Sequence, residues 1–331
     1  MSLSVLFIGG TGIISSACVV RSLALGFEVT VLNRGTTAIR PLPDGVRQVR
    51  GDIRDPDSVR AALGDESFDV VVEFAAFTPE HVQQDIDLFA GRTAQYVFIS
   101  SASAYQTPPT RLPITESTPL RNPFWEYSRD KIACEDLLVA EYRRSGFPIT
   151  IVRPSHTYDR TALPVDGGWT VIDRMRRGDE VVVLGDGTSL WTLTHTDDVA
   201  VGLVGLFGAS AAIGEAFHIT GDETPTWDQI HRALAAAAGV EARLVHVTSD
   251  AIAAADPALG AGIVGDKAHS MVFDNAKIRS VVPAFSPSVR FTAGAREIIE
   301  WYDADPARQV VDARLDALFD SLIETYRPRP L

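Results

Sequence analysis

A glycine-rich turn near the N-terminus constrains the fold more than any other feature of the sequence. It lies in the segment SVLFIGGTGIISS, between an apolar run typical of a buried strand and a helical pattern over residues 13–26. Glycines in this setting allow a tight turn and a close approach of the backbone to a pyrophosphate at the helix N-terminus. An ordinary tight turn is the alternative, but strand, turn and helix start all agree with dinucleotide binding. The candidate cofactor contacts here are Gly9, Gly10, Thr11, Gly12, Ile13 and Ile14.

The order of elements predicts a parallel sheet. Apolar runs alternate with helical patterns up to about residue 160, and the clearest helix is expected over residues 126–145. Such alternation is typical of an α/β protein with a Rossmann-type, doubly wound parallel sheet. We therefore expect a dinucleotide-binding domain over residues 1–160. Residues 161–331 should form mainly a smaller C-terminal substrate-binding lobe, from which residues 190–220 return to the sheet.

Composition and charge exclude several classes of protein. The net charge of −13 disfavours nucleic acid as a partner, because an acidic surface repels phosphates. No apolar run reaches the roughly 18 residues of a membrane span, and the N-terminal apolar run reads as a strand, not a signal peptide. Cys18 and Cys134 lack the spacing of metal ligands. We expect a cytoplasmic protein with no metal and no membrane partner.

The end of the second predicted strand bears on the choice of cofactor. NAD-binding folds usually carry an acidic residue there, whereas this chain has Asn33 and Arg34. An arginine can bind a 2′-phosphate, so NADP is slightly favoured over NAD; alternatively Arg34 stacks on adenine or faces solvent. The remaining candidates follow from the same topology: Asp52 and Ile53 at the adenine edge, and Ala75 and Ala76 where the cofactor backbone passes.

One lysine is placed as a catalytic partner. The chain has 30 basic residues, of which only Lys131, Lys267 and Lys277 are lysines. Lys131 follows Tyr127 by four residues, so both lie on one face of the predicted helix. A free phenol has a pKa near 10, and a cation at about 4 Å supplies the roughly 4 kcal/mol that brings it to about 7. We therefore interpret Tyr127 as an acid/base and Lys131 as its partner and a cofactor contact; a surface helix pair is the alternative.

Serines crowd the carboxyl end of the fifth predicted strand, where ligands bind in open α/β sheets. The segment FISSASAY carries Ser100, Ser101 and Ser103. These side chains can cap the strand end, but we expect at least one to hydrogen-bond the reacting oxygen near Tyr127.

With these residues, the chain resembles the extended short-chain dehydrogenase/reductases, the NAD(P)-dependent epimerase/dehydratase family. The resemblance runs over nearly the whole length, in the segments GGTGIIS, GDIRD, FISSASAY, YSRDK, IVRPSHTY, GDGTSLWTLTHTDDVA, FHITGDETPTWDQI and FTAGAREIIEWY. It implies Tyr127 as catalytic acid/base, Lys131 as its partner and Ser101 as the third member of the triad. It also implies that backbone around Pro154 contacts the nicotinamide, and that the protein is a homodimer built through helices including that of Tyr127.

Departures from the family pattern mark the chain as an atypical member. The Asp–Glu pair of the sugar-nucleotide 4,6-dehydratases is replaced by Ala102 and Ser103, which argues against that chemistry. The arginine that holds a nucleotide diphosphate is replaced by Trp191, which can stack on a sugar or another flat ring. His156 replaces a common asparagine and is a substrate contact, a second acid/base or a hydrogen-bonded pocket wall. Ser103, His156 and Trp191 are the candidate substrate contacts.

Two functions follow from this pattern. The first is an NAD(P)-dependent oxidoreductase or epimerase, transferring a hydride at a secondary alcohol or ketone of a sugar, a sugar nucleotide or a small natural product. The alternative is a non-catalytic dinucleotide-sensing or RNA-binding relative. The intact Tyr127–Lys131 pair and the acidic charge favour the enzyme.

Overall fold

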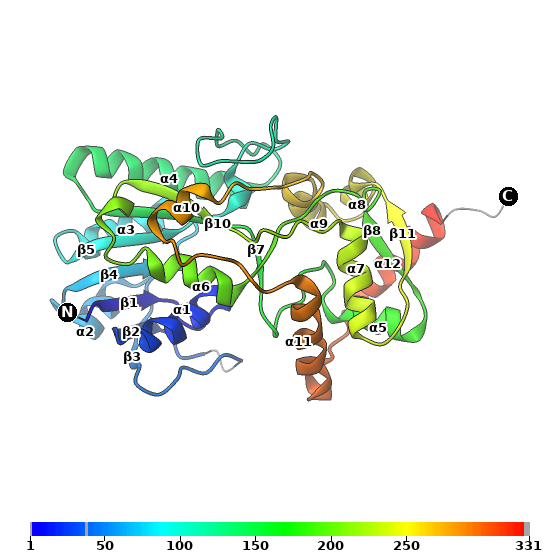
Figure 1. Cartoon of the computed structure of the whole chain (residues 1–331), viewed down its shortest axis with the longest axis horizontal. Helices are drawn as coiled ribbons and strands as arrows, with labels where there is room; N and C mark the ends of the chain where they lie inside the picture. The colour runs from blue at the N-terminus through cyan, green and yellow to red at the C-terminus, as the bar shows by residue number, and fades with distance from the viewer. Residues whose placement is uncertain (1, 37–38, 328–331) are drawn as a thin grey trace.

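Seven parallel strands form the central sheet of the computed structural model, which describes residues 2–36 and 39–327 (Figure 1). Their order is β10-β6-β5-β4-β1-β2-β3, the doubly wound order with a seventh strand added beside β6. The strands are β1 (Ser4–Ile8), β2 (Glu28–Asn33), β3 (Arg47–Arg50), β4 (Phe68–Glu73), β5 (Thr93–Ile99), β6 (Ile149–Pro154) and β10 (Glu215–Ile219). The expected Rossmann-type sheet is confirmed.

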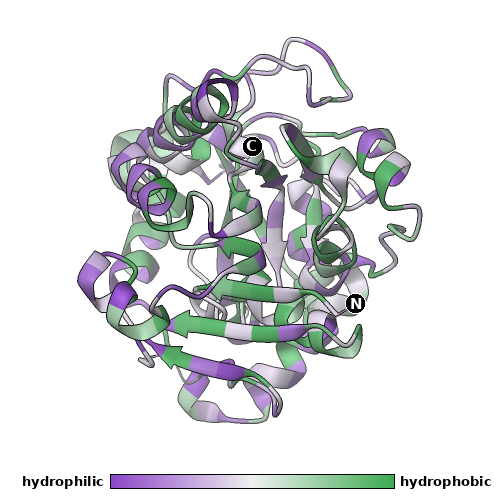
Figure 2. Cartoon of the chain, turned by 90° about the vertical axis from the view of Figure 1, so that its left-hand side faces the viewer, coloured by the Kyte–Doolittle hydropathy of each residue, from purple (hydrophilic) through white to green (hydrophobic). Residues whose placement is uncertain are grey.

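Helices cover both faces of the sheet, which is why its strands are apolar on both sides. Alternate residues of each strand face opposite layers, and in Figure 2 most strands are largely green, whereas the lowest strand, at the edge of the sheet, carries a long purple stretch. One layer contains α1 (Ile13–Ala24), α6 (Thr196–Gly205) and α10 (Ala276–Val281). The other contains α2 (Pro56–Leu63), α3 (Pro79–Phe89) and α4 (Glu126–Ser145). Free, buried Cys18 and Cys134 lie one in each layer.

A smaller lobe extends beyond the carboxyl ends of the strands (Figure 1). It has its own apolar core, which includes Trp169, Trp191 and Trp227. Two short parallel pairs belong to this half of the chain, β7 (His156–Tyr158) with β9 (Leu193–His195) and β8 (Glu180–Leu184) with β11 (Arg243–Val247). Its helices are α5 (Trp169–Arg177), α7 (Trp227–Ala237), α8 (Ser249–Ala255), α9 (Pro257–Gly262), a π-helical turn at Ile263–Lys267, α11 (Phe291–Asp303) and α12 (Ala313–Tyr326). Short 3₁₀ turns occur at Ala102–Ala104, Ser210–Ala212 and Pro306–Arg308.

The chain returns from the lobe to the sheet between residues 196 and 219. Helix α6 packs on α1, and β10 pairs in parallel with β6 along five residues. Helix α6 and strand β10 therefore tie the lobe to the sheet. None of the helices in residues 2–36 and 39–327 is long and apolar enough to cross a membrane.

A buried ion pair connects strand β6 with helix α4. Arg153 at the end of β6 donates to both carboxylate oxygens of Glu135 on α4, and it also donates to the Tyr105 hydroxyl at 3.2 Å. The Tyr105 hydroxyl lies 3.1 Å from Nδ1 of His218 on β10. Because these groups are buried and satisfy one another, they hold α4 in a fixed position against the sheet.

Two buried carboxyls, those of Glu73 and Asp85, lie near the end of β4. Burial and mutual repulsion raise the pKa of Glu73, and burial raises the pKa of Asp85 on α3 to about 7. Asp85 accepts a hydrogen bond from the Tyr96 hydroxyl at 2.7 Å. The low-dielectric setting therefore favours at least one protonated carboxyl near neutral pH.

This pair predicts a pH-dependent stability. A carboxyl whose folded pKa is raised stabilises the fold fully below its unfolded pKa, and that contribution is lost as pH rises through the folded pKa. We expect the free energy of unfolding to fall between about pH 5 and 8, by up to roughly 1.4 kcal/mol per pH unit for each proton lost. Asp85→Asn, which keeps an acceptor for Tyr96, should flatten this fall in urea titrations.

The matched control is Asp87→Asn, an exposed position on the same helix. It should leave the pH dependence as it is in the wild type. An Asp85→Asn profile that is as steep as the wild type would assign the dependence to other groups.

Candidate active site

The glycine-rich turn has the geometry of an anion site. Gly9 has φ +83°, a conformation that favours glycine, and Gly12 is the N-cap of α1. Ser15 closes the turn, because its hydroxyl donates to the Gly9 carbonyl at 2.7 Å and accepts from the Gly12 amide at 2.8 Å. Free amides and the positive end of the α1 dipole therefore lie together at the mouth of a cavity.

A first cavity of about 390 Å³ runs over the ends of β1, β2 and β4. Asn33 lines it, but its side-chain oxygen is occupied in a turn and accepts from the Gly35 amide and from Gln48, both at 3.1 Å. Arg34 is exposed on the rim, and Arg50 lies beside it, donating to the Arg34 carbonyl at 3.3 Å. Two guanidinium groups therefore lie where the second strand ends.

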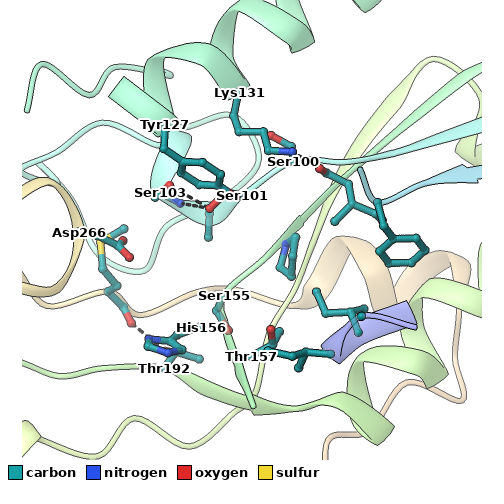
Figure 3. Close-up of a pocket in the computed structure, with 18 of the residues that line it drawn as sticks. Ser100, Ser101, Ser103, Tyr127, Lys131, Ser155, His156, Thr157, Thr192 and Asp266 are labelled. Carbon is teal, nitrogen blue, oxygen red and sulfur yellow. Dashed lines mark hydrogen bonds between the residues drawn. The ribbon is translucent and has the colours of Figure 1, made fainter. Parts of the chain in front are cut away.

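A second cavity of about 480 Å³ continues from the first, since Gly9 and Phe77 line both. Tyr127, Lys131 and Ser101 line this cavity together (Figure 3). It extends from the N-terminus of α1 into the lobe, so one continuous groove joins the anion site to the tyrosine.

The Lys131 ammonium forms the floor of this groove and is only 2% exposed. It donates to the carbonyl of Ala76 at 2.7 Å and to that of Ile99 at 2.8 Å. It also lies 4.8 Å and 4.7 Å from the ring centroids of Phe77 and Phe98. Two of its three N–H donors are thus satisfied by backbone at the ends of β4 and β5, and the third remains for a ligand.

The electrostatics of Tyr127 differ from the sequence expectation. Burial raises the pKa of Tyr127, a hydrogen bond with Ser101 lowers it and nearby Asp266 raises it, whereas Lys131 is not among the causes. The reason is geometric: the ammonium lies 5.8 Å from the centroid of the Tyr127 ring and is directed at backbone carbonyls. Burial also lowers the pKa of Lys131 to about 8. In this state the phenol is a proton donor at neutral pH.

A row of hydroxyls supports that donor. The Ser128 hydroxyl donates to the Ser103 hydroxyl at 2.7 Å. The Ser103 and Ser101 hydroxyls, which Figure 3 shows side by side, lie 2.8 Å apart. The Ser103 amide also donates to the Ser101 oxygen at 3.2 Å. Because donors approach the Ser101 oxygen from this side, its own proton is directed toward Tyr127 or a ligand. Ser100 instead hydrogen-bonds Glu135 in the buried network.

The lobe side of the cavity is aromatic. Trp191 stacks on Trp227 with ring centroids 5.4 Å apart, and its indole N–H donates to Nδ1 of His156 at 3.2 Å. Burial lowers the pKa of His156 to about 4, so the imidazole is neutral near pH 7 and carries its proton on Nε2. This geometry favours a fixed contact over a second acid/base.

Most of the predicted site residues line the two cavities. They are Gly9, Thr11, Gly12, Ile13, Ile14, Asn33, Arg34, Asp52, Ile53, Ala75, Ser101, Ser103, Tyr127, Lys131, Pro154, His156 and Trp191. Two predicted contacts lie beneath the surface. A side chain at Gly10 would meet Val31 at 2.7 Å, so this glycine serves packing against β2, and Ala76 is buried and supplies the carbonyl that binds Lys131.

The structure adds lining residues that the sequence argument did not single out. They are mainly Phe77, His81 and Arg54 in the first half of the groove, and Trp125, Asp266 and Lys267 in the second. Two features of the sequence could have indicated these residues. Arg54 lies within the segment GDIRD, which resembles the family pattern, and Lys267 is one of only three lysines. Asp266 is in an irregular segment and had none. Among residues 2–36 and 39–327, no group of three or more His, Cys, Asp or Glu side chains is arranged to hold a metal.

Comparison with known proteins agrees with this geometry. Residues 5–220 match the model of the NAD dependent epimerase/dehydratase family. The 2′-dehydrokanamycin reductase of Streptomyces kanamyceticus is 30% identical over 70% of this chain and 67% of its own length. The chloroplast stem-loop binding protein of 41 kDa b of Arabidopsis thaliana is 28% identical over 73% of this chain and 65% of its own length. The chain thus spans about two thirds of each of these relatives.

A solved structure shows the same fold. The dTDP-glucose 4,6-dehydratase of Bacillus anthracis, solved in complex with NAD, superposes with a TM-score of 0.73 at 17% identity, covering 92% of this chain and 98% of that one.

The lowered pKa of Lys131 leads to a prediction for the pH dependence of activity. Because the pKa of Lys131 is lowered to about 8, its charge is present at neutral pH and is lost above that value. We expect kcat/KM for reduction of a carbonyl substrate to be level below about pH 7.5 and to fall about tenfold per unit well above pH 8. In Lys131→Arg, whose guanidinium stays charged, the alkaline fall should disappear even if the plateau is lower.

Dinucleotide binding and thermal unfolding of the variant serve as controls for its fold. An alkaline fall that is identical in wild type and Lys131→Arg would assign it to a different group.

Proposed function

Since the chain belongs to the NAD dependent epimerase/dehydratase family, we propose that it is an NAD(P)-dependent oxidoreductase acting at a ketone or secondary alcohol of a sugar-like small molecule. The observation that carries the proposal is the shared cavity of Tyr127, Ser101 and Lys131, continuous with the anion site at Gly9 and Gly12. The similarity to a 2′-dehydrokanamycin reductase supports reduction as the net reaction.

The residues of the groove fit a dinucleotide. The amides at the α1 N-terminus would bind its pyrophosphate, Asp52 and Ile53 would border the adenine, and the third N–H of Lys131 would reach a ribose hydroxyl. Gly9 allows the turn because its φ of +83° is a conformation that other residues rarely adopt. When bound, the nicotinamide exchanges a hydride with the substrate carbon.

The chain's own groups handle the proton. Tyr127 donates its phenolic proton to the substrate oxygen during reduction, and Ser101 hydrogen-bonds the same oxygen or the phenolate that forms. The developing negative charge is stabilised by the Ser101 hydroxyl and by the Ser103 and Ser128 hydroxyls behind it, while the Lys131 cation, 5.8 Å from the centroid of the Tyr127 ring, adds a weaker attraction. In the oxidation direction the same groups act in reverse.

Dehydration and the use of a nucleotide-diphosphate sugar, both found in the family, fit this site less well. Dehydration would need an acidic pair next to Ser101, where Ala102 and Ser103 stand. Binding of a nucleotide diphosphate would need an unpaired cation in the substrate half of the cavity, but Lys267 is paired there with Asp166 and no arginine of residues 2–36 or 39–327 lines that half. Epimerisation of a simpler sugar would use the same hydride chemistry and differs in that the cofactor is regenerated. Assembly as a homodimer through α4 stays a prediction.

A non-catalytic role is the second candidate, favoured by the similarity to a stem-loop binding protein. The net charge of −13 and the buried Tyr127–Ser101–Lys131 constellation argue against it.

Removal of the phenolic hydroxyl separates the two candidates. We expect Tyr127→Phe to lower kcat by about 10²–10⁴-fold with a panel of keto sugars, because the proton donor is lost. Dinucleotide affinity should stay within about twofold of the wild type, since the ring at position 127 still packs against Trp125, whose centroid lies 4.8 Å from that of Tyr127. An unchanged rate would remove Tyr127 from the mechanism. No turnover in the wild type with any carbonyl or alcohol, despite dinucleotide binding, would favour the binding role.

The choice between NADP and NAD is tested at the rim of the groove. We propose that Arg34, with Arg50 beside it, binds the 2′-phosphate of NADP. Arg34→Ala should then raise Kd for NADPH about tenfold and leave Kd for NADH nearly unchanged. Arg47→Ala is the control, because Arg47 is on the edge strand β3 together with Arg50 but is paired with Glu66. Equal losses for NADH and NADPH would mean that Arg34 contacts a part that both cofactors share.

A further inference from the structure

One carboxyl in the substrate half of the cavity, that of Asp266, has no side-chain partner in residues 2–36 and 39–327. Lys267 is neutralised by an ion pair with Asp166, with 2.7 Å between Nζ and Oδ1. Lys131 is committed to two carbonyls on the floor, and His156 is neutral. Asp266 remains, and its carboxyl has no hydrogen bond or ion pair with any of residues 2–36 and 39–327. The pocket therefore presents one uncompensated carboxyl to its ligand.

The position of Asp266 is fixed by the catalytic loops. It lies on the π-helical turn Ile263–Lys267, a type of helix that is frequent at functional sites. Asn122 ties this turn to the serine segment, because its amide donates to the Gly265 carbonyl at 2.6 Å and to the Ser103 carbonyl at 2.9 Å. Trp125 packs so closely on Gly265 that a side chain there would meet it at 2.7 Å.

The carboxyl of Asp266 faces the cavity from the side of Tyr127 (Figure 3). It is close enough that its charge raises the pKa of the phenol. Burial in turn raises the pKa of Asp266 to about 7, with Lys267 opposing and Asp166 adding to the effect. A ligand that carries a positive charge would restore the ionised carboxylate, whereas a diphosphate would be repelled.

The rest of the wall suits a sugar ring that carries such a charge. Trp125, which is half-buried, lines the same cavity, and aromatic faces bind both sugar rings and cations, whereas Trp191 is buried against Trp227 and contributes to the wall. An uncharged hydroxyl could only hydrogen-bond Asp266, whereas an ammonium group would also stabilise its ionised form.

We propose that Asp266 is a specificity residue that binds a protonated amine of the substrate, so that the substrate class is an amino sugar or a related amine-bearing polyol ketone. The inference rests on the proposed function, because it names the substrate of the same site. It assigns no role to Asp266 in hydride or proton transfer.

Binding of matched sugars tests the assignment. The probes are glucose and its three monoamino derivatives with the amine at C2, C3 or C6, titrated at about pH 7.5 with saturating dinucleotide and followed by NMR. We expect at least one amino sugar to bind about tenfold or more tightly than glucose. In Asp266→Asn this preference should fall to about one, with glucose affinity unchanged, since the amide keeps similar size and polarity.

The matched control is Asp250→Asn, an exposed aspartate on α8 that lies outside the cavity lining. It removes the same formal charge from the protein and should keep the amine preference, which excludes a general effect of net charge. The inference is overturned if no amino sugar exceeds glucose in the wild type, or if Asp266→Asn keeps the preference.

The amine assignment is tested by binding selectivity, whereas the proposed function is tested by turnover. Binding selectivity does not require turnover, so it can be measured in Tyr127→Phe as well as in the wild type. Loss of selectivity with activity retained would overturn only the amine assignment, and selectivity without turnover would overturn only the enzymatic role.

Discussion

The burial of one ammonium group, that of Lys131, is the constraint on which the rest of the site depends. A cation that is 2% exposed is costly unless its donors are satisfied, and here backbone carbonyls of Ala76 and Ile99 accept two of them while two phenyl rings flank it. Those carbonyls belong to the ends of neighbouring parallel strands, so the lysine ties α4 to the sheet at the point where ligands bind in doubly wound folds. The positions of Tyr127 and the serine row follow from that attachment.

Much of this arrangement could be predicted from sequence because it depends on short-range rules. The four-residue spacing put Tyr127 and Lys131 on one helical face, and the predicted helix over residues 126–145 is confirmed as Glu126–Ser145. The helix Pro79–Phe89 was not predicted, because its polar residues obscure the apolar stripe that packs on the sheet. The direct lowering of the Tyr127 pKa by Lys131 was also expected, but spacing fixes which face a side chain shares and not where its terminal atom points. Asp266 lies in an irregular segment whose place in the cavity arises only from tertiary contacts such as Asn122 with Gly265.

The two halves of the groove differ in what determines them. The half over β1, β2 and β4 is built from the backbone turn and strand ends, which the family pattern specifies closely. The half in the lobe is lined by Trp191, His156 and Asp266, and there Trp191 and His156 stand where the family pattern has an arginine and an asparagine. On the proposed function, the hydride and proton chemistry would depend on the residues at the sheet, and the choice of substrate on the residues of the lobe.

The most direct test of this account is the titration of the Lys131 ammonium itself. The chain has only three lysines, so a protein labelled with ¹⁵N in lysine gives three side-chain signals, and Lys131→Arg assigns one of them. The account predicts that the signal missing from Lys131→Arg titrates with a midpoint of about pH 8 in the free protein, because burial lowers the pKa of this group. A midpoint near 10, the value of a solvated lysine, would contradict it, since the ammonium would then lie in water and would not hold α4 to the strand ends.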